Sequence, residues 1–140
     1  RSKNNNFIAV GYSESFFSKG MKDVLMVKID SLGNKMWMNL YGGKSDDIAN
    51  SVFECKDSGF AIAGETTSFG SGKNDILILK TNSNGVQKWK STIGGKGVDI
   101  GRSIEELPKG GFILSGTSTI SNLSFDSILI KTDKKGKTSN

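Results

Sequence analysis

Residues 75–89 read DILILKTNSNGVQKW, and this stretch decides the fold. Its aliphatic run, residues 76–79, is typical of a β-strand that is covered on both faces. The Asn and Gly residues that follow favour a tight turn, after which a short segment leads to a tryptophan. Related stretches begin at Asp23 (DVLMVKIDSLGNKMW) and at Asp126 (DSILIKTDKKG). The sequence therefore predicts a pair of strands, joined by a turn, that occurs repeatedly in this chain.

The repeat extends over the whole chain, with a unit of about 52 residues. This spacing separates two tryptophans, two glycine pairs and two aspartates: Trp37 and Trp89, Gly42-Gly43 and Gly94-Gly95, Asp47 and Asp99. The segments FIAVGYS, FAIAGET and FILSGTS, which begin at Phe7, Phe60 and Phe112, also correspond. The 140 residues hold about 2.7 copies of the unit. We assign one repeat domain, residues 1–140, made of a partial unit 1–41, a complete unit 42–93, a partial unit 94–137 and a basic tail 134–140.

The complete unit predicts four strands, at residues 48–55, 60–66, 75–81 and 86–93. Each is bounded by Gly, Asn, Asp or Ser and is too short for a stable helix. In the second strand, alternation places Phe60 and Ile62 on one face and Ala61 and Ala63 on the other. We therefore predict an all-β fold, with ten strands in the chain.

Two architectures use four strands per repeat. In a β-propeller, four-stranded antiparallel blades, typically about four to eight of them, pack face to face around a channel. In a β-trefoil, three four-strand units form one closed barrel. We favour the propeller because ten strands are too few for a complete trefoil and because trefoil units are usually shorter. The trefoil remains the alternative.

The unit resembles the β-propeller repeats of bacterial and archaeal secreted and surface proteins. The shared pattern is D-hydrophobic-K-T/D-x-x-G-x-x-x-W, then Y-G-G-x-x-D-D, then G-G-hydrophobic-G-x-T, and it covers Phe7 to Lys137. The turn before the tryptophan is similar to the corner of quinoprotein-type propellers. The chain departs from the pattern at Asn82 and Val98, where the family has aspartate. The resemblance implies an extracellular or cell-surface location and further propeller blades as partners, in the same longer chain or in a homo-oligomer.

Residues that recur in each copy are expected to support the fold, because a ligand rarely occupies every blade. Asp or Asn at the end of the third strand accepts hydrogen bonds from the turn, and the glycine adopts a positive φ. The indole that follows is expected to lie between adjacent sheets. This structural corner consists of Asp30, Gly33, Trp37, Asn82, Gly85, Trp89, Asp133 and Gly136.

Other residues are candidates for binding. A possible binding loop carries exposed aromatic side chains, at Tyr12, Phe16, Phe17 and Phe69; packing of the loop on itself is the competing interpretation. Asp46 and Asp47 form a carboxylate pair that suits Ca²⁺. One copy alone carries this pair, without D-x-D-x-D spacing, so we assign no metal and keep it as a calcium candidate.

Composition limits the possible functions. The chain has no histidine, which excludes His-dependent catalytic and metal sites, and its net charge of +5 is distributed along the sequence. No apolar run approaches the roughly 18 residues that span a membrane. We expect a non-enzymatic binding or scaffold module without a cofactor, nucleic-acid partner or membrane span, and with a possible protein or glycan ligand. The alternatives are a lectin-like glycan-binding repeat protein and, with less support, a fragment of a quinoprotein-type enzyme.

Overall fold

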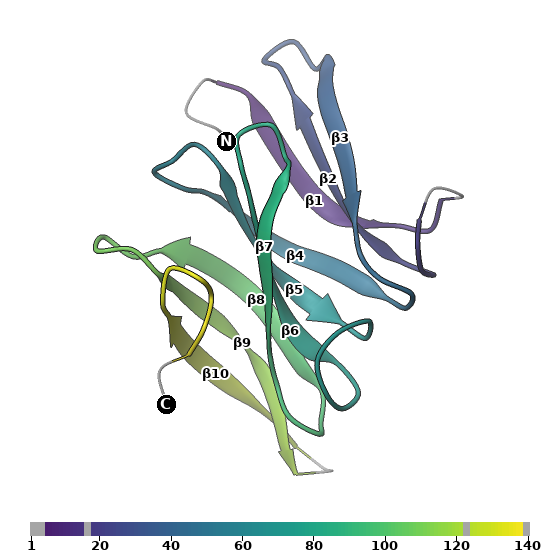
Figure 1. The fold of residues 1–140 in the computed structure, drawn as a ribbon, viewed down its shortest axis with the longest axis vertical. Coiled ribbons are helices and arrows are strands. Elements are labelled where there is room, and N and C mark those ends of the chain that lie inside the picture. Colours follow the sequence, from purple (N-terminus) through teal and green to yellow (C-terminus); the bar gives the residue numbers. More distant parts are fainter. Residues whose placement is uncertain (1–4, 16–17, 122–123, 139–140) are drawn as a thin grey trace.

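The computed structural model describes residues 5–15, 18–121 and 124–138. These residues form ten β-strands and no helix, and the strands assemble into three antiparallel sheets (Figure 1). The prediction of an all-β fold is therefore confirmed. The described part of the chain contains no helix that is long and apolar enough to cross a membrane.

Each sheet contains strands that follow one another in sequence. The first sheet contains β1 (Phe7–Ser13), β2 (Asp23–Ile29) and β3 (Lys35–Tyr41). The second contains β4 (Asp47–Glu54), β5 (Phe60–Thr66), β6 (Asp75–Thr81) and β7 (Gln87–Ile93). The third contains β8 (Asp99–Glu106), β9 (Phe112–Ser121) and β10 (Ser124–Thr132). Every neighbouring pair is antiparallel, as expected for strands joined by short turns.

The predicted strands of the complete unit match the second sheet closely. Residues 60–66 and 75–81 have the predicted bounds, whereas β4 begins and ends one residue earlier than predicted and β7 begins one residue later. Asp47 joins the ladder because it pairs with Thr66. Cys55 leaves the ladder because its amide donates to the Gly59 carbonyl at 2.8 Å and so closes the turn.

The second sheet is buried on both faces because its side chains alternate between two hydrophobic clusters. Phe60, Ile62, Leu77 and Leu79 pack with buried residues of the first sheet, among them Met26. On the opposite face, a second set packs with the third sheet: Ala61, Ala63, Ile76 and Ile78 against Ile104, Phe112 and Leu114. All seven residues of β6 are buried. The aliphatic run of the sequence thus forms a strand between two cores, as predicted.

Contacts between the sheets also involve the first strand of each unit. Strand β4 lies against β1 and β2, and β8 lies against β4, β5 and β6. The Asn50 side-chain amide donates to the Gly101 carbonyl at 3.0 Å and joins β4 to β8. A Cβ on Gly101 would lie 3.0 Å from Ile76 Cγ2, so glycine allows this close approach.

The described residues form three separate sheets and no closed barrel. A β-trefoil requires its units to close into one barrel. The strand pairing of the described residues does not contain this closure. Each of the three sheets falls within one of the three sequence units.

The two tryptophans lie between adjacent sheets. The Trp37 ring packs edge-on against Phe60 of the second sheet at 6.1 Å between centroids, and Trp89 packs on Phe112 of the third sheet at 5.8 Å. The interplanar angle is 64° in both pairs. Trp37 also approaches the corner glycine of the next sheet, since a Cβ on Gly85 would lie 2.9 Å from the indole. We call this combination of Trp, Phe and Gly the indole lock.

Replacement of Trp37 by alanine removes the indole lock between the first two sheets. We expect Trp37→Ala to lower the free energy of unfolding by about 3–5 kcal/mol, because it leaves a cavity beside Phe60. Denaturant unfolding measures this change. Met36→Ala is the matched control, because Met36 is the preceding residue of β3 and is 52% exposed. Equal, small effects of both substitutions would contradict the indole lock.

Candidate functional site

The three corners of the structure have the same hydrogen bonds. Asp30 Oδ1 accepts from the amides of Leu32 and Asn34 at 2.9 and 2.8 Å. Asn82 and Asp133 each accept from the amides two and four residues later, in the same way. The Asn34 side-chain amide, with backbone amides, lowers the pKa of Asp30. Backbone amides, with that of Lys137 first, lower the pKa of Asp133. The polar groups of the corner are thus engaged within their own turns.

The corner glycines have the backbone conformation that the sequence predicts. Gly33, Gly85 and Gly136 have φ values of 88°, 76° and 74°, which side chains other than glycine rarely adopt. Gly136 also lies against Trp89, because its Cβ would be 2.8 Å from the indole. The Asp, Asn and Gly residues of the corner therefore form the turns, and its two tryptophans belong to the indole locks. All of these roles are contacts within the protein.

The calcium candidates lie at the start of β4, where protein groups already engage Asp47, whereas the buried Oδ1 of Asp46 accepts no hydrogen bond from the described residues. Asp47 is buried, and its carboxylate accepts from the Gly43 amide at 2.8 Å and the Ser68 hydroxyl at 2.6 Å, as well as from Thr66. Asp46 lies 4.0 Å from Lys22 Nζ. In the described ranges, no group of three or more His, Cys, Asp or Glu side chains is arranged to hold a metal ion.

The Gly-Gly segments provide space for pairs of buried aspartates. A Cβ on Gly42 would stand 2.2 Å from Asp23 Oδ1 and 2.9 Å from Asp47 Oδ2. The next unit repeats this arrangement at Gly94, between Asp75 and Asp99. Burial, and to a smaller extent the charge of Asp99, raises the pKa of Asp75. Because both units have the pair, we interpret it as part of the framework between the sheets.

The residues of the possible binding loop lie in different surroundings. Tyr12 is 49% exposed, with Lys22 Nζ 5.2 Å from its ring centroid. Phe69 is half-buried, with Lys90 Nζ 2.9 Å from its ring centroid, and its ring end lies beside Gly43. Phe16 and Phe17 lie outside the described residues.

A different site lies between the second and third sheets, in a groove of about 480 Å³. Seven of its lining residues are charged: Lys56, Lys80, Lys88, Lys109 and Lys134 against Asp57 and Glu106. Trp89, Phe112 and two adjacent glycines complete much of its wall. We call this feature the lysine groove. It is the candidate functional site of the chain.

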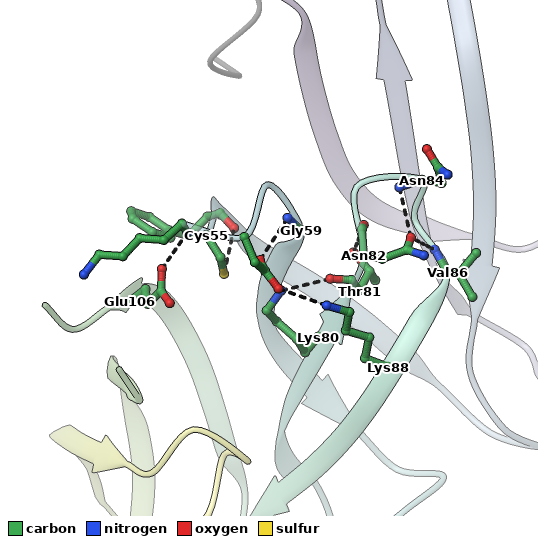
Figure 2. Close-up of polar contacts among 12 residues, drawn as sticks. Cys55, Gly59, Lys80, Thr81, Asn82, Asn84, Val86, Lys88 and Glu106 are labelled. Atoms are coloured by element: carbon green, nitrogen blue, oxygen red, sulfur yellow. Dashed lines mark hydrogen bonds and ion pairs between the residues drawn. The ribbon is translucent and has the colours of Figure 1, made fainter. Parts of the chain in front are cut away.

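An ion-pair cluster builds one wall of the lysine groove. The Lys80 side chain is buried, and its Nζ lies 2.9 Å from Asp57 Oδ1, in the turn between β4 and β5. Lys88 Nζ lies 3.0 Å from Asp57 Oδ2. Figure 2 shows Lys80 and Lys88 extending toward the same point. Lys80 also donates to the Thr81 carbonyl at 2.9 Å, so its ammonium group is held in place by the fold.

This cluster shifts the acidity of Asp57. Burial alone would raise the pKa of Asp57, but hydrogen bonds from Lys80, Lys88 and the Gly59 amide outweigh it and lower the pKa to about 2. Asp57 is therefore ionised at neutral pH and neutralises part of the charge of the two lysines.

A second set of contacts joins the two sides of the groove. The Lys56 amide donates to Glu106 Oε2 at 2.7 Å, and Lys56 Nζ donates to the Pro108 carbonyl at 2.6 Å. Cys55, the residue before Lys56, is fully buried. Burial raises the pKa of the Cys55 thiol to about 11, so this cysteine is protonated at neutral pH and is a poor nucleophile.

The remaining lysines leave positive charge at the rim of the groove. Lys109 and Lys134 are exposed, and within the described part of the chain neither forms an ion pair. The Lys134 stem lies over Gly110, whose Cβ would be 2.4 Å from Lys134 Cε. The absence of a side chain at Gly110 thus allows the lysine to reach across the turn.

Sequence reasoning missed the lysine groove because its lysines are separated along the chain by turns and strands. A signal was nevertheless present in the differences between copies. Lys88 corresponds to Met36 in the first unit, whereas Lys109 and Lys134 correspond to Asp57 and Ser83 in the second. The indole locks recur at both junctions, but this set of lysines occurs only at the second.

Comparisons with known proteins give no further guide: no protein-family model matches the chain, and no match is found among curated proteins.

The Asp57 cluster predicts a specific acid sensitivity. Its folded pKa of about 2 lies below the ordinary value of 3.8, so its stabilising effect is present above pH 4 and is lost as the pH falls toward 2. After allowance for solvent screening, we expect the wild-type free energy of unfolding to fall by about 1 kcal/mol more than that of Asp57→Asn between pH 5 and pH 2. Urea unfolding of both proteins at several pH values measures this difference. The exposed Glu105→Gln control should follow the wild type; parallel curves for wild type and Asp57→Asn would refute the prediction.

Proposed function

We propose that this chain is a segment of a β-propeller and serves as a non-enzymatic binding or scaffold module. The observation that carries the proposal is the indole lock, which recurs at both junctions with nearly the same geometry. Units that bury each other in this way form a quasi-repetitive stack, in which each sheet depends on its neighbours. On this proposal, residues 1–41, 42–93 and 94–137 belong to successive blades.

The outer faces of the stack support the presence of further blades. Phe60 is fully buried, whereas its counterpart Phe7 in the first sheet is 44% exposed. Ile78 is likewise fully buried, whereas its counterpart Leu129 in the third sheet is 73% exposed. Both exposed residues occupy positions that an adjacent sheet covers in the middle unit. We propose that blades of the same longer chain cover these two faces, in a secreted or cell-surface protein as the repeat resemblance implies.

The second candidate function is lectin-like glycan binding. The lysine groove favours it, because a pocket of about 480 Å³ that combines an aromatic side chain with several polar groups lies in the size range of small-ligand sites. The two candidates are compatible, since a propeller blade junction can present the groove.

The proposal is tested by the association of the 140-residue chain in solution. Without covering blades, its bare faces should drive concentration-dependent association, which light scattering measures. Leu129→Lys should reduce association, because it places a charge on one bare face. Val86→Lys is the matched control, since Val86 is 61% exposed although its sheet is covered on both faces. A chain that stays monomeric at all concentrations, or equal effects of both variants, would contradict the proposal.

A further inference from the structure

We propose that the lysine groove binds an acidic saccharide, a sugar that carries carboxylate or sulfate groups. The inference rests on the proposed function, because it assigns a ligand class to the junction between two blades. It names Lys88, Lys109 and Lys134 as the residues that contact the anionic groups.

The charge balance of the groove indicates an anionic ligand. Five lysines and two carboxylates line it, so its walls carry an excess of positive charge. Part of that charge is used by the fold, since Asp57 pairs with Lys80 and with the partly exposed Lys88, and Lys56 binds the Pro108 carbonyl. The exposed lysines at 109 and 134 keep their charge toward solvent, where it attracts an anion at long range.

A comparison of the two junctions indicates that the fold does not require the three contact lysines. Both junctions have the lock of tryptophan, phenylalanine and corner glycine. At the first junction, Met36, Asp57 and Ser83 occupy the positions that correspond to the three contact lysines. Because the fold forms at the first junction without these lysines, stacking of the sheets does not require them at the second. Lys109 and Lys134 form no ion pair within the described residues, so a ligand that only the second junction receives explains their presence.

The other walls of the groove suit a sugar better than a polyphosphate. The half-buried Trp89 lines the groove, and the exposed part of its ring is an apolar surface for the C–H groups of a sugar. Glu106 uses Oε2 to accept the Lys56 amide, and its other oxygen is an acceptor for a sugar hydroxyl. A phosphodiester chain offers few hydroxyl donors to Asp57 and Glu106, whereas an acidic saccharide brings its anionic groups to the lysines and its hydroxyl groups to the carboxylates.

Binding should be measured by calorimetry with the wild-type chain and four probes of similar length. The probes are oligogalacturonate for the carboxylate, a κ-carrageenan oligosaccharide, which has sulfate but no carboxylate, for the sulfate, a cello-oligosaccharide as the neutral sugar, and single-stranded DNA as the phosphodiester. We expect saturable binding of at least one acidic saccharide, at least tenfold tighter than the neutral sugar and DNA, and weakened by added salt.

The key variant converts the second junction to the residues of the first, by Lys88→Met, Lys109→Asp and Lys134→Ser. These residues are compatible with the fold because the first junction contains them. The control variant, Lys96→Met, Lys44→Asp and Lys35→Ser, makes the same charge change at exposed lysines outside the groove. We expect the first triple variant to weaken acidic-saccharide binding at least tenfold and the control to change it less than threefold.

Three results would overturn the inference: no saturable binding of either acidic saccharide, tighter binding of DNA, or equal weakening by both triple variants. Which of the two acidic probes binds identifies the anionic group. Failure of this test leaves the propeller proposal intact, because association of the chain through its outer faces is measured separately and does not involve the three lysines.

Discussion

The packing of one indole between two sheets is the interaction on which the rest of the structure depends. A three- or four-stranded sheet of this size cannot bury a core alone, so each unit is stable only against its neighbour. Trp37 and Trp89 supply the contact, because each lies on the phenylalanine of the next sheet and beside its corner glycine. The glycine provides both the turn and the space for the ring. Substitution at any one of these positions is therefore expected to destabilise two sheets.

The repeated parts of the fold are predictable from sequence because three copies of each pattern are present in one chain. The strands at 60–66 and 75–81, the alternation of Phe60 and Ala61 between faces, and the positive φ of Gly85 all follow from local patterns. Strand ends were less predictable. Cys55 continues the apolar pattern of β4, but its amide is used to close the following turn.

The lysine groove depends on the three-dimensional arrangement of the sheets, which a local pattern does not contain. Lys56, Lys88 and Lys134 lie far apart in sequence, and they line one groove only because adjacent sheets bring their corners together. Even Asp57, which has the sequence pattern of an ordinary turn residue, forms ion pairs with two lysines of other strands. Residues shared by all copies support the fold, whereas residues confined to one junction are the candidates for a function. The resemblance to secreted propeller repeats leads to a location and to further blades, and both remain proposals.

A double-mutant cycle between Trp37 and Phe60 measures the strength of the indole lock. The free energies of unfolding of the wild type, Trp37→Leu, Phe60→Leu and the double variant give the coupling between the two rings across the first junction. We expect a coupling of about 0.5–1.5 kcal/mol, as for other edge-on aromatic pairs, and a similar value for Trp89 and Phe112. Additive effects at both junctions, with no measurable coupling, would contradict the indole lock.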